Sequence, residues 1–131
     1  MKKIIITALA LVTLSVSSRA LTLDGYEKLS SQIQSNSKDV EVQKAMLNTY
    51  LTAVAETLTS LRGADGKISL NKNESMCISK EININADFVK KFAEEPLKKP
   101  AQFRGVFGEG WKDIVLTDYI TGIMMMAFKC N

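Results

Sequence analysis

The sequence contains no histidine, and its 131 residues include only two cysteines, two prolines and one tryptophan. Without histidine, Ser-His-Asp and Cys-His catalytic groups cannot form, and most catalytic zinc sites lose a usual ligand. Glu94 and Glu95 are adjacent and point in different directions on a helix, which favours a solvated helix end over an acid–base pair. Gly105, Gly108 and Gly110 lack the order of a GxGxxG phosphate-binding turn. We therefore expect no enzymatic activity, no cofactor and no bound metal.

The first 20 residues have the three parts of a bacterial secretory signal peptide. Lys2 and Lys3 form a basic start, and residues 4–16 form a mostly apolar run. Ser18 and Ala20 are small residues at the −3 and −1 positions of a cleavage site. The run is short for a membrane span of roughly 20 residues, so an uncleaved anchor is the less favoured alternative. We expect cleavage after Ala20 and localisation in the periplasm.

The mature chain also lacks an excess of charge of either sign. Lys2, Lys3 and Arg19 account for three of the 17 basic residues, so residues 21–131 carry 14 basic and 14 acidic side chains. Nothing in this balance favours nucleic acid or an anionic membrane as a partner. We expect one small helical domain over residues 21–131, free of the membrane after signal cleavage.

The two cysteines, Cys77 and Cys130, are expected to form one structural disulfide. An exported protein meets an oxidising compartment, where paired cysteines are oxidised. The bond would pin a chain end that otherwise frays and would contribute on the order of 4 kcal/mol in the chain-entropy model. An intermolecular disulfide and a free reactive thiol are the alternatives.

Apolar residues recur with helical periodicity over most of the mature chain. The clearest stripe steps by four and three residues through Leu47, Leu51, Val54, Leu58 and Leu61. The pattern predicts an all-α fold, a small bundle of about four helices stapled by one disulfide. The expected helices cover residues 25–35, 39–62, 86–96 and 111–128.

Capping residues set the expected ends of these helices. Asp24 with Glu27 three residues later forms a capping-box pattern at the start of the first helix. Gly63 suits the C-terminal cap of the second helix. Asn85 can cap the third helix, and Pro96 marks its expected end.

The last predicted helix is apolar on almost every side between residues 119 and 128. Such a helix is buried on more than one face. It is expected to be either the central helix of the bundle or, in addition, the seam of a homodimer.

Two segments between helices are candidates for binding a partner. The polar 63–76 segment can stay exposed at little cost, and a short hairpin around Ile68 and Leu70 is possible there. The 103–111 segment alternates glycines with aromatic residues, which opposes a regular helix. Aromatics anchor interfaces, but they also fill cores, so we favour the first segment for contact inside a partner's cleft. The candidate binding residues are Asp65, Lys67, Asn71, Phe107 and Trp111.

Four parts of the mature chain resemble the Rap/Tai family of bacterial immunity proteins. They are "GYEKL" from Gly25, "YLTAVAETL" from Tyr50, "CISKEININADFVKKFAEEP" from Cys77 and the terminal "FKC" that ends at Cys130. The second part matches the family's Y-[IL]-x-x-V-x-[ED]-x-L element. Family members often carry another cysteine pair between the first two helices, and Leu47 stands here in place of one such cysteine.

The resemblance implies a periplasmic immunity protein, often dimeric, that protects the producing cell from a peptidoglycan amidase delivered by a type VI secretion system. Such a protein would bind the cognate secreted amidase effector and block its catalytic cleft. Two other classes fit a small exported helical domain with one disulfide. One is a periplasmic acid-stress chaperone, and the other is an envelope accessory or adaptor protein.

Overall fold

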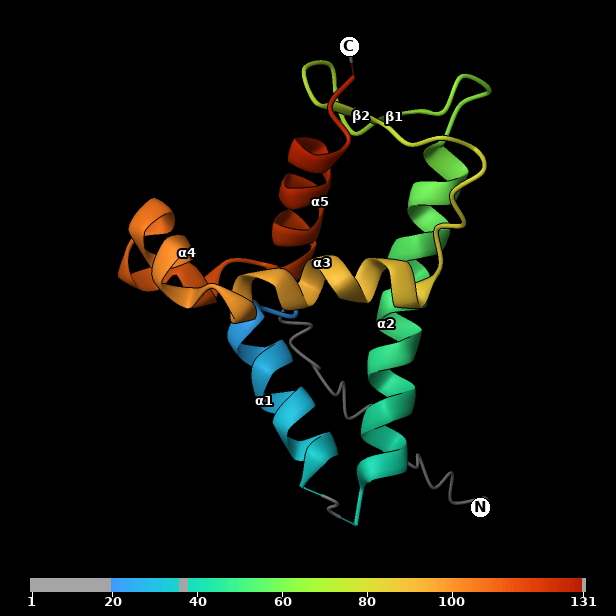
Figure 1. The fold of residues 1–131 in the computed structure, drawn as a ribbon. Helices are drawn as coiled ribbons and strands as arrows, with labels where there is room; N and C mark the ends of the chain where they lie inside the picture. Colours follow the sequence, from blue (N-terminus) through green and yellow to red (C-terminus); the bar gives the residue numbers. More distant parts are fainter. Residues whose placement is uncertain (1–19, 36–37, 131) are drawn as a thin grey trace, which may run out of the picture.

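The computed structural model describes residues 20–35 and 38–130, which form mostly helical structure with one small sheet (Figure 1). The predicted signal peptide lies outside the described residues, apart from Ala20. The elements in chain order are α1 (Leu23–Gln34), α2 (Val40–Leu61), β1 (Lys67–Ser69), β2 (Ser75–Cys77), α3 (Ala86–Lys98), α4 (Pro100–Phe107), the 3-10 helix η1 (Glu109–Asp113) and α5 (Leu116–Ala127).

Helix α1 starts earlier than the capping-box pattern predicts. Its N-cap is Thr22, whose Oγ1 accepts a hydrogen bond from the Gly25 backbone N–H at 3.2 Å, so Asp24 lies inside the first turn. Backbone hydrogen bonds join this start to the segment before α5, from Leu23 N–H to the Ile114 carbonyl and from Leu116 N–H to the Leu21 carbonyl. The start of α1 is therefore held by contacts with a segment distant in the sequence, which the local capping pattern could not reveal.

Helix α2 agrees with the expected range to within one residue at each end. Leu47, Leu51 and Leu58 are buried, whereas Leu61 at the end of the predicted stripe is exposed. Gly63 does not adopt the left-handed conformation of a C-terminal cap; Gly66 does, with φ of 81°. A Cβ on Gly66 would lie 2.8 Å from the Ile78 carbonyl oxygen, so this turn requires glycine.

The sheet corrects the all-α prediction. Strands β1 and β2 form an antiparallel hairpin in which Ile68 pairs with Met76. Both side chains are fully buried, while Lys67 and Ser69 on either side of Ile68 are exposed. This alternation of buried and exposed residues has the period of a half-buried strand. It covers only three residues in each strand, which is too short to predict a strand from the sequence.

Helix α3 begins where the sequence predicts and ends later. Asn85 caps it, because its Oδ1 accepts the Phe88 backbone N–H at 2.8 Å. Pro96 does not end the helix, which continues to Lys98. Proline removes only its own N–H from the hydrogen-bond ladder, so the residues after it can still donate.

The glycine- and aromatic-rich segment is more regular than predicted, and this shortens the last helix. Pro100 occupies the first turn of α4, and Gly105 is accommodated inside it. Gly108 ends α4 with φ of 79°, and the chain continues through η1. Consequently α5 starts at Leu116 rather than near residue 111.

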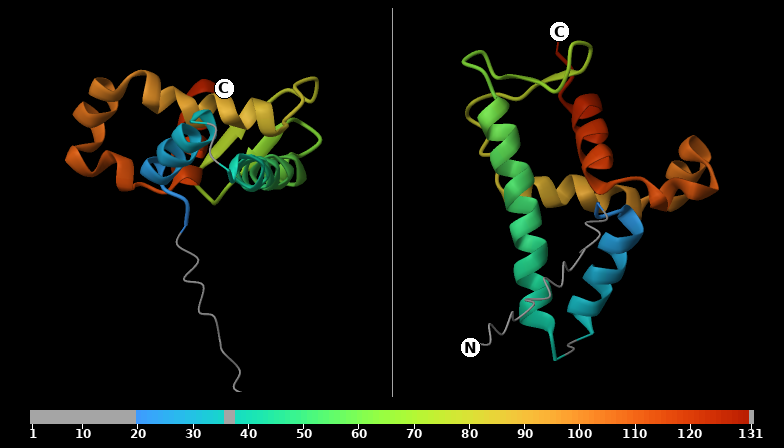
Figure 2. Two further views of the ribbon diagram at one scale, coloured as in Figure 1. Left: turned by 90° about the horizontal axis from the view of Figure 1, so that it is seen from below. Right: turned by 180° about the vertical axis from the view of Figure 1, so that it is seen from behind.

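Helices α2 and α5 stand on either side of the core, α3 crosses them, and the hairpin spans the ends of both (Figures 1 and 2). The buried core draws on α1, α2, the hairpin, α3 and α5. Helix α5 packs against α3, α1 and β2, whereas α3 contacts α2, α4 and α5 and crosses the middle of the molecule. The central helix is therefore α3 and not the last helix, in which Met126 is exposed. The Cys77–Cys130 disulfide is confirmed, with the two Cα atoms 5.0 Å apart.

Candidate functional site

The polar residues predicted at the 63–76 segment lie at the hairpin end of the molecule. The Asp65 Oδ1 accepts the Lys67 backbone N–H at 3.0 Å. The Asn71 Oδ1 accepts the backbone N–H groups of Asn73 and Glu74 at 2.8 and 3.0 Å. Both side chains therefore hold the turns of the hairpin in shape, which is a role that sequence reasoning did not assign to them.

Lys67 is exposed on β1 and makes no ion pair with the described residues. It stands directly opposite Cys77 in the hairpin register, so its position is fixed beside the disulfide. Of the three predicted polar residues, Lys67 is the one whose side chain makes no hydrogen bond or ion pair with the described residues, so its ammonium group is left for a partner.

Contacts from two sides hold the hairpin end in place. The Cys77 backbone N–H donates to the Phe128 carbonyl at 2.8 Å, next to the disulfide that fixes Cys130. On the other side, the Arg62 Nη1 donates to the carbonyls of Ser79 and Ile82 at 3.2 and 2.8 Å. These links tie the hairpin to the ends of both α2 and α5.

The predicted aromatic residues divide between core and surface. Trp111 is only 2% exposed, and its carbonyl accepts the Tyr119 hydroxyl at 2.7 Å. Phe107 is 49% exposed and packs its ring against Phe103 and Tyr119, with centroid distances of 6.1 and 5.5 Å. Of the predicted pair, only Phe107 is accessible to a partner, together with the neighbouring Val106.

The structure does not bring the two predicted binding segments, residues 63–76 and 103–111, together. The hairpin lies at one end of the molecule, and α4 with η1 projects from the side at the other end of α3 (Figure 1). We call the two regions the hairpin end (residues 63–79) and the arm (residues 100–113). A small partner surface would therefore contact only one of the two regions.

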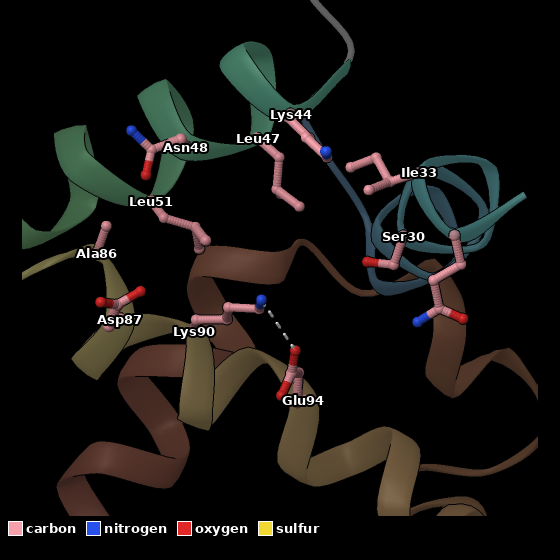
Figure 3. A pocket seen from close by; sticks show the side chains of 11 residues that line it. Ser30, Ile33, Lys44, Leu47, Asn48, Leu51, Ala86, Asp87, Lys90 and Glu94 are labelled. Atoms are coloured by element: carbon pink, nitrogen blue, oxygen red, sulfur yellow. Dashed lines mark ion pairs between the residues drawn. The ribbon is translucent and has the colours of Figure 1, made fainter. Parts of the chain in front are cut away.

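A groove of about 380 Å³, lined by both polar and apolar side chains, lies between α1, α2 and α3 (Figure 3). Lys90 pairs with Glu94 at 3.8 Å across one wall, and Lys44 stands on α2. The buried Tyr26 hydroxyl donates to Glu94 Oε1 at 3.3 Å. Burial and the Glu94 charge raise the pKa of Tyr26 to about 12. Sequence reasoning missed this groove, because it treated Glu94 as part of a solvated helix end.

A second groove, of about 290 Å³, is almost wholly apolar. It lies between α2 and α5 and is bordered by the hairpin through Leu70. Val54 and Leu61 contribute from α2, and Thr117 and Thr121 contribute from α5. No signal in the sequence marked it, because Val54 and Leu61 belong to the stripe predicted to be core.

Within residues 20–35 and 38–130, no three His, Cys, Asp or Glu side chains are grouped as a metal site would require. No helix in this part of the chain is long and apolar enough to cross a membrane. Comparisons of the chain with protein-family models, with curated proteins and with solved structures found no match. The family resemblance therefore stays a prediction, and function is argued from the surfaces described above.

Proposed function

We propose that the mature chain is a periplasmic immunity protein that binds a type VI secreted peptidoglycan amidase and blocks its catalytic cleft. The motifs from Gly25 to Cys130 support this class. The protein would act by occupying a surface and not by catalysis, in line with a sequence that has no histidine.

The observation that carries the proposal is the bracing of the hairpin end. An inhibitor must place atoms inside a cleft, and a projection that is already ordered loses less conformational entropy on binding. The disulfide fixes β2, and the Asp65 and Asn71 side chains fix the turns. The exposed ammonium group of Lys67 is thereby held on a rigid support.

We assign the main contact to Lys67 and supporting roles to Asp65 and Asn71. The mature chain has equal numbers of acidic and basic side chains, so it exerts no long-range electrostatic attraction on a charged partner. A single positioned charge would therefore contribute to the specificity of binding more than to the rate of association. Phe107 on the arm is the secondary contact, because half of its side chain is accessible.

The proposal is tested by searching the adjacent genes for a secreted cysteine-histidine amidase and by assaying that amidase with the purified mature protein. We expect tight binding at neutral pH, loss of peptidoglycan hydrolysis, and rescue of cells that export the amidase. Lys67→Glu should weaken binding by more than about tenfold, roughly 1.4 kcal/mol. The matched control is Lys91→Glu, an exposed lysine on α3. Equal effects of the two substitutions would contradict the assignment to the hairpin end.

A chaperone is the second candidate, because Val42, Met46 and Leu61 expose apolar surface on α2. A chaperone should suppress aggregation of unrelated proteins near pH 2 to 3, below the usual carboxylate pKa values. Broad protection at that pH without a specific partner would replace the immunity proposal. Specific inhibition of one amidase at neutral pH would exclude the chaperone as the main function.

A further inference from the structure

The groove between α1, α2 and α3 continues into a neighbouring hollow of about 370 Å³. The two hollows share Asn48 on α2 and Ala86 and Asp87 at the start of α3. Together they form one elongated depression between α2 and α3, which we call the α2–α3 trough.

The trough has an apolar floor and a polar rim. Its floor consists of buried side chains from α2 and the segment before α3, namely Leu47, Leu51, Ala55 and Ile84. The α2 side of the rim is a row of exposed or half-exposed polar side chains at intervals of four residues, so they are neighbours along the helix. This row is Lys44, Asn48, Thr52 and Glu56.

The two ends of the trough carry opposite charges. Lys44 lies next to Ile33 of α1, and Asp87 lies at the opposite end of the groove, next to Ala86 (Figure 3). Glu56 lines the same hollow as Asp87, and neither carboxylate makes an ion pair or hydrogen bond with the described residues. Lys44 has only an exposed ion pair with Glu41 at 3.3 Å, which contributes little. The charges at both ends are therefore available to a ligand.

The other two charges on the α3 side of the trough offset each other. The Lys90 Nζ and Glu94 Oε1 atoms are 3.8 Å apart, and the buried Tyr26 hydroxyl donates to the same carboxylate oxygen at 3.3 Å. The pKa of Tyr26, raised by burial to about 12, keeps this donor protonated at neutral pH. Lys90 and Glu94 thus leave the charge pattern to the two ends of the trough.

We propose that the α2–α3 trough binds a short peptide in an extended conformation. The free ammonium end lies at Glu56 and Asp87, and the free carboxylate end lies at Lys44. The inference goes beyond the proposed inhibition, since it depends on no amidase. A polyanion would be repelled at the acidic end, and a polyamine would be repelled at Lys44, whereas a peptide with free ends matches both.

Length and polarity agree with a peptide as the occupant. From Lys44 to Glu56 the trough follows α2 for about 18 Å. An extended peptide of about five residues has this length. The Asn48 amide and the Thr52 hydroxyl lie between the charged ends and can both donate to and accept from a peptide backbone. The buried floor suits an aliphatic side chain, as in other ligand sites.

Nuclear magnetic resonance titration of the oxidised, isotope-labelled mature protein tests the proposal. The probe is a pentapeptide of alanine with leucine at its centre, and two matched forms carry an acetylated amino end or an amidated carboxyl end. We expect a dissociation constant below about 1 mM for the unblocked peptide, with shifted amide signals at Asn48, Thr52 and Asp87. Blocking either end should weaken binding by about tenfold or more, because one charged end of the trough is left without its partner.

Paired changes in protein and peptide test the orientation. In protein with both Glu56→Gln and Asp87→Asn, acetylation should no longer weaken binding, whereas amidation still should. In Lys44→Gln protein, amidation should lose its effect and acetylation should keep it. All three side chains are exposed, so the melting temperatures should stay nearly unchanged. The matched control is Lys91→Gln, an exposed residue of α3 that does not line the trough and should alter neither effect.

Four results would overturn the proposal. They are no binding of the unblocked peptide at about 1 mM, equal binding of blocked and unblocked peptides, end effects that the variants leave unchanged or exchange, and loss of amidase binding in the same variants. The last result would assign the trough to the amidase. Conversely, peptide binding with the expected end effects in a protein that inhibits no amidase would leave this inference intact and remove the proposed function.

Discussion

The hairpin end and the arm were both candidates for partner binding, and they are stabilised in different ways. The hairpin end is held by covalent and polar links: the Cys77–Cys130 bond, the Arg62 hydrogen bonds and the Asn71 turn. The arm is held by aromatic packing around the buried Trp111.

The two regions also differ in whether the residues that support the surface are the same as those that can contact a partner. At the hairpin end, the fully buried side chains of Ile68, Met76 and Ile78 are supplemented by cross-links, and the side chains of Lys67 and Ser69 on the outer face of β1 are polar. On the arm, the same cluster of aromatics that forms the support also supplies the exposed ring of Phe107. A substitution on the arm therefore changes stability and surface together, whereas at the hairpin end the two can be changed separately.

The largest expected effect is that of Trp111→Ala, which should lower the free energy of unfolding by about 3–5 kcal/mol, because it removes a buried aromatic side chain. Phe107→Ala is the control on the same arm and should cost far less, since half of that side chain already faces solvent. Chemical denaturation followed by circular dichroism measures both. Similar losses for the two variants would show that Trp111 is not the support of the arm.

Loss of the disulfide is the next largest effect. The double substitution Cys77→Ser with Cys130→Ser should lower the free energy of unfolding by about 4 kcal/mol, because the unfolded chain regains conformational freedom. Hydrogen exchange should quicken at the Cys77 amide, which bonds the Phe128 carbonyl, while Trp111 fluorescence in the folded state stays unchanged. A changed fluorescence of the folded variant would show that the two regions are coupled.

Alkaline pH should weaken the arm before the hairpin end. Burial raises the pKa of Tyr119 above its usual value of 10.0. The folded protein then binds more protons than the unfolded chain, so this contribution is complete below pH 10.0 and is lost as the pH rises through the folded-state pKa. Trp111 is the sole tryptophan, and its carbonyl accepts the Tyr119 hydroxyl, so its fluorescence reports the change. Earlier loss of hairpin amide protection would contradict the expectation.

The smallest effect on stability is expected at the tip of the hairpin. Asn71→Ala should cost about 0.5–1 kcal/mol, because the backbone N–H groups of Asn73 and Glu74 lose an acceptor but remain open to water. Lys67→Ala should change stability by less than about 0.5 kcal/mol. Thermal unfolding of the two variants separates them. If Lys67→Ala is the more destabilising, Lys67 supports the hairpin and is not a free contact residue.

Local signals in the sequence predicted much of the helical structure. The stripe of α2 and the Asn85 cap of α3 act within a few residues, so they are visible without the fold. The disulfide was predictable for a different reason, because two cysteines in a chain that is expected to be exported allow only one intramolecular pairing. These features depend on residue type and spacing alone.

Only the tertiary structure decided the ends of α1 and α3, the helical form of α4 and the formation of the hairpin. Three residues of a strand, or three glycines near aromatics, carry too weak a local preference, and contacts with distant segments decide the outcome. The same reason applies to the surfaces. Trp111 and Phe107 are both aromatic and four residues apart, yet one is buried and the other is half exposed. Leu61 belongs to the stripe that begins in the core, yet its side chain is half exposed, because it lies on the wall of the apolar groove between α2 and α5.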